Sequence, residues 1–444
     1  MIRFATTTAA ACLALALSAG RVGAQTGVQI PLQFDFLNPG AKSLALGGAF
    51  VGLADDATAT FANPAGLTLL GGSEVSVEFR GGRIDTEFLR AGRLSGTITN
   101  IGTDTIQGPA FGDSTGTHSG IGYLSFVYAH PSHRWVVAAY RHELARIDQG
   151  FTSNGVFQQE PGFFTSSRDS PQTGTREVSI TGYGVSGSVK LRPDLSVGAG
   201  LAIYTFTLDS LFRRGDVGGF FDAPNFDVQF GRATQSGDDT AAAPIVGVLW
   251  DRGRARVGAM FRKGASFAMS TQDAPANPVV DGRFRVPDTL GVGASIRVKP
   301  QLIVAGEVTY ISYCRLVTDF IVDQAQGFGH AADFSIDNGT EVHVGAQYAV
   351  QRQGRSPIRL RAGAWFDPDH SVHFATNRPP LNISDKEFVE RISVALSRGK
   401  NQLHATGGVG INLSSRFEFN AGVDIASTHQ VISASIIAHV GKEN

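Results

Sequence analysis

Phenylalanine and arginine gather in one stretch of the chain, residues 208–230. Its phenylalanines are Phe212, Phe220, Phe221, Phe226 and Phe230, and Arg213 and Arg214 follow the first of them. Aromatic rings can hold an alkyl chain, and a guanidinium group binds a carboxylate through charge-assisted hydrogen bonds. The stretch could therefore bind an amphipathic molecule. For any single ring, packing within a long loop is the simpler alternative.

Charged residues at alternate positions form a second candidate set. If the strands alternate as described below, the inward-facing members are Arg256, Arg262, Arg359, Arg361, Glu418 and Asp424. Opposed charges that line a lumen mostly pair with one another or hold an internal segment. Arg262 is the candidate for binding a ligand carboxylate, because it lies near the outer end of its strand.

Other kinds of chemistry have little support in the sequence. The 444 residues contain no phosphate-binding glycine loop, no metal-spaced histidine pair and no nucleophile elbow. His404 and Ser433 could share an inner face, but such coincidences are common among 11 histidines. With 38 basic and 39 acidic side chains, the protein has no broad basic surface for nucleic acid. We therefore predict no enzyme activity, cofactor, metal site or nucleic-acid partner.

The first 24 residues have the three parts of a secretory signal peptide. Arg3 supplies a positive start, residues 9–18 are apolar, and small residues precede Gln25. Cys12 would leave with this leader, so Cys314 would be the only cysteine of the mature chain and no intrachain disulfide could form. The remaining residues contain no run of 18 apolar side chains, so no transmembrane helix is expected.

One unit recurs along the rest of the chain: an alternating strand, a short polar turn and another alternating strand. In residues 417–425, for example, apolar side chains occupy every second position and Glu418, Asn420 and Asp424 lie between them. Six short turns stand out, at residues 130–133, 192–194, 251–254, 299–301, 351–357 and 414–416. Strands of about ten residues with this period are typical of membrane β-barrels.

Longer segments separate these hairpins. They lie at about residues 90–118, 146–175, 209–238, 271–283, 319–337 and 368–397, with a tight seventh connection near residues 427–429. Short turns at one end and long loops at the other predict an all-β protein, an outer-membrane antiparallel barrel of 14 strands over residues 73–444. The alternative is a soluble β-sandwich or several small β domains, but the strands continue to the C-terminus without linkers.

A different pattern fills residues 25–72. Residues 40–44 read Gly-Ala-Lys-Ser-Leu, an Asp-Asp-Ala step follows at 55–57, and the segment closes on Asn63, Pro64, Ala65 and a Gly-Leu pair. Small residues dominate and no strand alternation is present, so the segment can lie close against other surfaces. A compact segment of this kind before a long all-β region reads as a plug inside a barrel.

The order and spacing of these motifs resemble the N-terminal hatch of the FadL-type outer-membrane transporters of hydrophobic compounds. The resemblance implies a monomer in the bacterial outer membrane that takes up long-chain fatty acids or similar hydrocarbons passively. It also implies that Asn63, Pro64 and Ala65 border the substrate path, and that the loop with Phe212, Phe220 and Phe221 captures substrate. The alternative is a non-transporting barrel of the same superfamily that acts as a partner or anchor for a secretion system.

Two features depart from the regular pattern. Residues 135–140 are apolar on both faces. In the resembled family the third strand bends inward and opens the barrel wall; the alternative is a strand buried on both sides by the plug. The chain ends Val-Gly-Lys-Glu-Asn, whereas outer-membrane barrels usually end on an aromatic residue.

Overall fold

The computed structural model describes residues 38–440 except 133, 160–165, 217–219, 318–319 and 321–330. The predicted leader, residues 1–24, and the first part of the predicted plug, residues 25–37, lie outside this range. No helix in the described part of the chain is long and apolar enough to cross a membrane.

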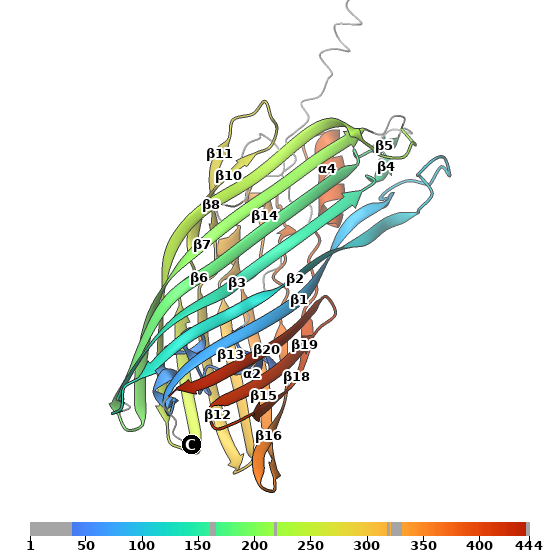
Figure 1. Cartoon of the computed structure of the whole chain (residues 1–444). Coiled ribbons are helices and arrows are strands. Elements are labelled where there is room, and N and C mark those ends of the chain that lie inside the picture. Colours follow the sequence, from blue (N-terminus) through green and yellow to red (C-terminus); the bar gives the residue numbers. More distant parts are fainter. Residues whose placement is uncertain are drawn as a thin grey trace, which may run out of the picture.

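Fourteen antiparallel strands pair in one closed ring (Figure 1), which confirms the predicted barrel. In order around the wall they are β1 (Ser73–Arg93), β2 (Gly108–Ala129), β3 (Trp135–Ser153), β6 (Gln172–Arg192), β7 (Leu195–Asp216), β8 (Asn225–Asp251), β9 (Ala255–Arg262), β12 (Thr289–Lys299), β13 (Leu302–Ile311), β15 (Gly339–Arg352), β16 (Arg355–Asp367), β18 (Gln402–Asn412), β19 (Phe417–Ile425) and β20 (His429–Val440). Pairing of β20 with β1 closes the ring. Closure leaves neither β1 nor β20 as a free edge strand.

Smaller elements lie inside the barrel or at its two ends. They are α2 (Ala41–Ala45), α3 (Ala59–Ala62), η1 (Pro64–Leu69), β4 (Phe157–Gln159), β5 (Ser166–Arg168), β10 (Ser266–Gln272), β11 (Val280–Arg285), η2 (Tyr313–Leu316), η3 (Ala331–Asp333), β14 (Phe334–Ser335), β17 (His373–Phe374) and α4 (Ile383–Ala395). All six predicted short turns join strands at one end, here called the turn end. The long connections, with α4, lie at the other, the loop end (Figure 1).

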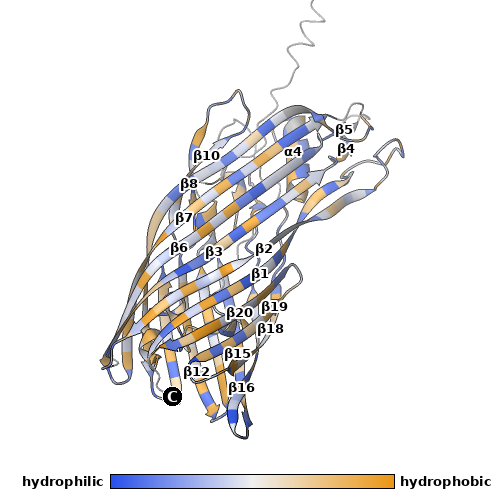
Figure 2. Cartoon of the chain, viewed as in Figure 1, coloured by the Kyte–Doolittle hydropathy of each residue, from blue (hydrophilic) through white to orange (hydrophobic). Residues whose placement is uncertain are grey.

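The side chains of the wall alternate as predicted, and hydropathy alternates along the strands in Figure 2. On β16, Leu360 is 49% exposed on the outside, whereas Arg361 and Trp365 are buried inside. On β20, Ile432 is exposed and its neighbour Ser433 is buried. An apolar outer face can contact lipid because the ladders of a closed sheet pair the backbone amides and carbonyls wherever neighbouring strands are in register.

Residues 38–70 pack inside the turn end of the ring. Described contacts reach strands from every part of the wall. The Gly40 amide donates to Glu78 of β1, the Phe50 amide to Glu307 of β13, and the Thr60 carbonyl accepts from Ser186 of β6. The α2 helix packs against β16, β18, β19 and β20. A segment can contact all sides of a closed ring only from within it.

Glycines make this close packing possible. A Cβ atom on Gly363 of β16 would lie 2.5 Å from the carbonyl carbon of Leu46 and 2.6 Å from the amide nitrogen of Gly47. On the next strand, a Cβ on Gly407 would have no heavy atom nearer than 3.8 Å. Backbone of the internal segment therefore lies directly on backbone of the wall at Gly363.

This difference between the two glycines yields a testable prediction. Gly363→Ala is expected to destabilise the protein by about 1–3 kcal/mol, because overpacking against backbone cannot relax by a side-chain rotation. The temperature at which the barrel unfolds in detergent should fall. Gly407→Ala is the matched control and should leave that temperature unchanged. An equal effect of the two substitutions would contradict the close approach at Gly363.

Three sequence predictions need correction. The segment at 209–238 is not a long loop, because β7 runs to Asp216 and β8 begins at Asn225. The segment at 90–118 is likewise mostly strand, and 271–283 contains parts of the β10–β11 hairpin. The physical reason is that these strands continue beyond the apolar outer band, where outward residues turn polar and the expected pattern disappears.

The predicted irregularity at residues 135–140 is also misplaced. Trp135 and Val137 face outward and are exposed, whereas Val136 and Ala138 face inward and pack on the internal segment. The stretch is a regular strand, apolar on both faces because one face meets the outer band and the other meets the internal segment. It is not covered on both sides, and its ladder with β2 ends just beyond it, at His142.

Candidate functional site

Toward the loop end the inner face of the wall is apolar and its outer face is polar, whereas nearer the turn end the outer face is apolar. On β7, Phe206 and Leu208 are buried inside, whereas Thr205, Thr207 and Asp209 are exposed outside. The same strand nearer the turn end has Leu201 and Ile203 outside. An apolar lumen surrounded by a polar exterior cannot be explained by contact with lipid. It gives this part of the barrel an interior suited to apolar molecules.

The apolar interior draws on several strands and loops. Its members include Ile147 of β3, Val178 and Ile180 of β6, Phe206 and Leu208 of β7, Phe267 and Met269 of β10, Phe284 of β11, Ile392 of α4, and Leu396, which follows α4. Phe206 stacks on Phe267 with ring centroids 4.8 Å apart and on Phe284 at 5.1 Å. We name this set the upper lumen. The upper lumen was not predicted from the sequence, although the exchange of inner and outer polarity along β7 is a signal for it.

One cation lies at the base of the upper lumen. The Arg262 guanidinium lies 4.0 Å from the ring centroid of Phe61, which is the α3 side chain that reaches this cluster. Arg262 is 7% exposed, and its Nη1 has no hydrogen-bond partner among the described residues. The described carboxylates form no ion pair with it. A buried cation with an unpaired donor lowers the stability of the fold unless a ligand accepts a hydrogen bond from it.

The residues around Arg262 place both aromatic rings and polar atoms at the bottom of the upper lumen. His142 of β3 packs edge-on to Phe61 at 4.2 Å, and its Nδ1 is also buried without a hydrogen-bond partner. Tyr140 and Tyr204 belong to the same cluster. The site therefore offers apolar rings together with a guanidinium donor of Arg262 and a ring nitrogen of His142 that both lack a hydrogen-bond partner among the described residues. Arg262 faces the lumen as the alternation predicted, whereas its role in binding stays a prediction.

Asn63, Pro64 and Ala65 have a clear structural role. The Asn63 side chain donates to the carbonyls of Val51 at 3.0 Å and Val248 at 3.2 Å, and its oxygen accepts from the Ala65 amide at 3.2 Å. These contacts end α3, begin η1 and fix both to β8. All three residues are buried. Their predicted place beside a substrate path stays a prediction.

The phenylalanines of residues 208–230 divide into separate groups. Phe212 of β7 is buried, its ring centroid lies 6.3 Å from that of Phe151 of β3, and both belong to one cluster with Phe88 of β1. Phe220 and Phe221 lie beyond the end of β7 and pack against Phe157, at centroid distances of 5.6 and 5.9 Å. The Arg168 guanidinium lies 4.9 Å from the Phe157 ring centroid. The predicted single aromatic loop is therefore one inner patch and one patch at the rim, of which Phe220 is exposed.

The predicted lumen charges are engaged with other polar groups. Arg359 donates to Asn412 at 2.9 Å and pairs with Glu418 at 3.3 Å. Arg361 donates to Gln347 at 2.8 Å and Asn420 at 2.7 Å. Asp424 accepts from Trp365 Nε1 and His404 Nδ1, both at 2.9 Å. These contacts agree with a role in lining and bracing the wall. In the described residues no group of three metal-ligating side chains is close enough to hold a metal ion.

A buried ion pair orders the loop after β1. Arg93 Nη2 lies 2.6 Å from Asp104, whose carboxylate also accepts from the Thr99 amide at 2.9 Å. Burial opposes ionisation, but the hydrogen bonds from Arg93 and Thr99 prevail and hold the pKa of Asp104 below its usual value. A lowered pKa stabilises the folded loop above the unfolded pKa of about 3.9 and loses that effect as the pH falls through the folded value.

We expect hydrogen exchange at residues 94–107 to be constant from pH 5 to 8 once corrected for intrinsic rates, and to accelerate only below about pH 4. Asp104→Asn should accelerate exchange throughout pH 5 to 8, since it removes the ion pair with Arg93, and its difference from wild type should shrink as Asp104 becomes protonated at lower pH. Acceleration of wild-type exchange already between pH 5 and 7 would contradict this role.

The wall is irregular between β2 and β3. Their ladder ends at Tyr123 and His142, and the strands meet again where Ser114 Oγ donates to the Gly150 carbonyl at 2.8 Å. Register shifts beside Glu78 on β1 and after Glu143 on β3 lie at the same level. Residues 117–122 and 143–147 therefore face one another without ladder pairs. β-Bulges are common where a strand bends or where pairing with its neighbour ends.

Solved structures share this architecture. A Pseudomonas aeruginosa FadL homologue matches with a TM-score of 0.58 at 14% identity, over 91% of this chain and 99% of that one. The chain has the FadL-type barrel fold. The Pseudomonas putida toluene transporter TodX matches with a TM-score of 0.53 at 14% identity, over 92% and 100% of the two chains. The CymD monoaromatic hydrocarbon channel gives 0.53 at 14% identity, over 93% and 100%. No protein-family model and no curated sequence matches the chain.

Proposed function

We propose that this FadL-type barrel lies in the bacterial outer membrane and takes up hydrophobic molecules, such as long-chain fatty acids or hydrocarbons. The observation that carries the proposal is the apolar upper lumen, enclosed by strands whose outer face is polar. Transfer of an apolar molecule from water into this interior is favourable without another energy source. The protein would act as a monomer and perform no chemical conversion.

The structure suggests an order of contacts for the ligand. It would first meet the rim patch of Phe157, Phe220 and Phe221 and then enter the upper lumen. Arg262, above Phe61, would bind a carboxylate if the ligand has one, and the alkyl chain would lie along Phe206 and Phe267. Charge-assisted hydrogen bonds to a guanidinium are strong in such dry surroundings.

Residues 25–72 would act as the hatch below this site. The Asn63, Pro64 and Ala65 turn lies next to Phe61, so movement of the turn would change the floor of the upper lumen. Release could follow sideways between β2 and β3, where ladder pairs are missing. The small polar cavity there, about 10 Å³, would have to widen, since that volume holds about one water.

Mass spectrometry of the small molecules that remain bound after gentle extraction tests the proposal. We expect a stoichiometric fatty acid or similar apolar compound, released by denaturation. A stoichiometric protein partner without a bound apolar molecule would contradict uptake and favour a role as the anchor of a secretion system.

A further inference from the structure

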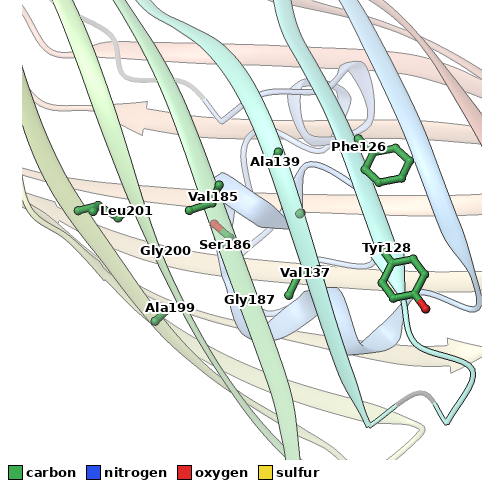
Figure 3. A pocket seen from close by; sticks show the side chains of 11 residues that line it. Phe126, Tyr128, Val137, Ala139, Val185, Ser186, Gly187, Ala199, Gly200 and Leu201 are labelled. Atoms are coloured by element: carbon green, nitrogen blue, oxygen red, sulfur yellow. The ribbon is translucent and has the colours of Figure 1, made fainter.

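The outer wall carries an apolar hollow on β2, β3, β6 and β7 (Figure 3). Its volume is about 670 Å³, within the range of ligand-sized pockets. The side chains at its margins include Phe126, Val185 and Leu201, which are 53%, 61% and 50% exposed. The hollow lies outside the barrel, on the opposite side of the wall from the internal segment, and is distinct from the upper lumen.

Strand register explains the hollow. One row of paired outward residues reads Phe126, Ala139, Val185 and Leu201, and the next reads Tyr128, Val137, Gly187 and Ala199. Small residues therefore form a bent diagonal, from Ala139 of the first row to Gly187 and Ala199, which pair with each other in the second. A Cβ atom on Gly187 would have no heavy atom nearer than 3.7 Å, so no close contact requires glycine there. The diagonal leaves a trough in a surface that is otherwise covered by large side chains.

Cations and aromatic rings lie at the turn end of this trough. Trp135 follows Val137 toward the turn, packs 5.8 Å from Tyr128 and stacks on His130 at 4.7 Å. Arg134, in the turn before β3, and Arg192, the last residue of β6, are exposed and form no ion pair among the described residues. Asp194, the acidic residue of that turn, pairs with Arg252 at 3.1 Å.

The spacing of these parts matches one kind of molecule. Arg134 lies three residues from Val137, about 10 Å along an extended strand. Tryptophan and tyrosine mark the boundary between hydrocarbon and headgroups, and arginine beside that boundary attracts lipid phosphate. The turns at this end thus carry exposed cations, and the wall above them presents an aromatic boundary and then an apolar trough.

We propose that this face binds one anionic phospholipid of the surrounding membrane, with an acyl chain in the trough and its phosphate at Arg134 and Arg192. The site rests on the membrane position of the barrel proposed above, but not on transport. It would keep a lipid in a fixed place below the irregular part of the β2–β3 wall.

Native mass spectrometry of the full-length protein in detergent, titrated with phosphatidylglycerol or phosphatidylcholine, tests this site. We expect one phosphatidylglycerol to bind, at least tenfold more tightly than phosphatidylcholine. Ala139→Leu with Ala199→Leu fills the trough and should weaken both lipids at least tenfold. Arg134→Ala with Arg192→Ala should remove the preference for phosphatidylglycerol and leave phosphatidylcholine binding unchanged.

Matched controls lie on β12, three strands beyond β7. Ala294 faces outward there and Arg297 lies near its turn end, so Ala294→Leu and Arg297→Ala should have no effect. Equal lipid binding by wild type and the trough variant would overturn the proposal, as would a protein dimer that forms in place of the lipid complex. Binding is measured without a transported molecule, so this outcome is separate from any failure of uptake.

Discussion

Replacing Arg262 with methionine is expected to weaken binding of a fatty acid by roughly 10- to 150-fold, the effect of losing a hydrogen bond to a charged group worth about 1.5–3 kcal/mol. The guanidinium is buried over Phe61 and forms no ion pair with the described carboxylates, so a ligand carboxylate would be its partner. A neutral hydrocarbon of the same length should bind Arg262→Met as well as it binds wild type. Equilibrium binding of the two compounds to purified protein measures the difference.

Arg359→Met is the matched control for this prediction. Arg359 also faces the lumen, but Asn412 and Glu418 already bind its guanidinium. We expect it to affect stability and to leave fatty-acid binding unchanged. Because a buried cation without a partner is costly, Arg262→Met should not lower the unfolding temperature of the empty protein. Equal loss of acid and hydrocarbon binding would show that Arg262 only shapes the cavity.

Glu307→Ala is expected to release the internal segment from β13. One carboxylate oxygen of Glu307 accepts from the amides of Phe50 at 2.8 Å and Val51 at 2.7 Å. Loss of the acceptor leaves two buried amides unpaired, at a cost of about 1–3 kcal/mol each. Single-channel recordings in planar bilayers should show ion conductance that the wild-type protein lacks, and protease should cleave residues 38–72 faster.

Glu418→Ala provides the comparison for Glu307→Ala. Glu418 is another lumen carboxylate, but its described partners are wall arginines and not amides of the segment. Conductance should therefore stay low in this variant. If Glu307→Ala remained closed and resistant to protease, the segment would be held by its glycine-rich backbone contacts alone, and Glu307 would not be its anchor.

Much of the fold could be predicted because the physics of a membrane barrel is local and periodic. The alternation that places Leu360 outside and Arg361 inside is visible in a few consecutive residues, as are the turn residues of all six hairpins. The small residues around Gly47 and Gly52 similarly predict a segment that lies close to other backbone. These signals need no knowledge of distant contacts.

The candidate site was harder to predict because it depends on where the polarity of the wall reverses. Phe206 and Phe267 are 61 positions apart in the sequence, and only the barrel brings their rings to 4.8 Å. Phe212, Phe220 and Phe221 are close in sequence but belong to different groups, because β7 extends past the outer apolar band. Arg262 was recognised from alternation, but its missing partner is visible only in three dimensions.

The central claim is that hydrophobic molecules cross the membrane through this barrel. Its most direct test is uptake of a radiolabelled long-chain fatty acid by cells with and without the gene, at concentrations where entry limits the rate. We predict faster uptake in the cells that carry the gene, reduced by Arg262→Met and unaffected by Arg359→Met. Equal uptake with and without the gene would contradict the proposed function.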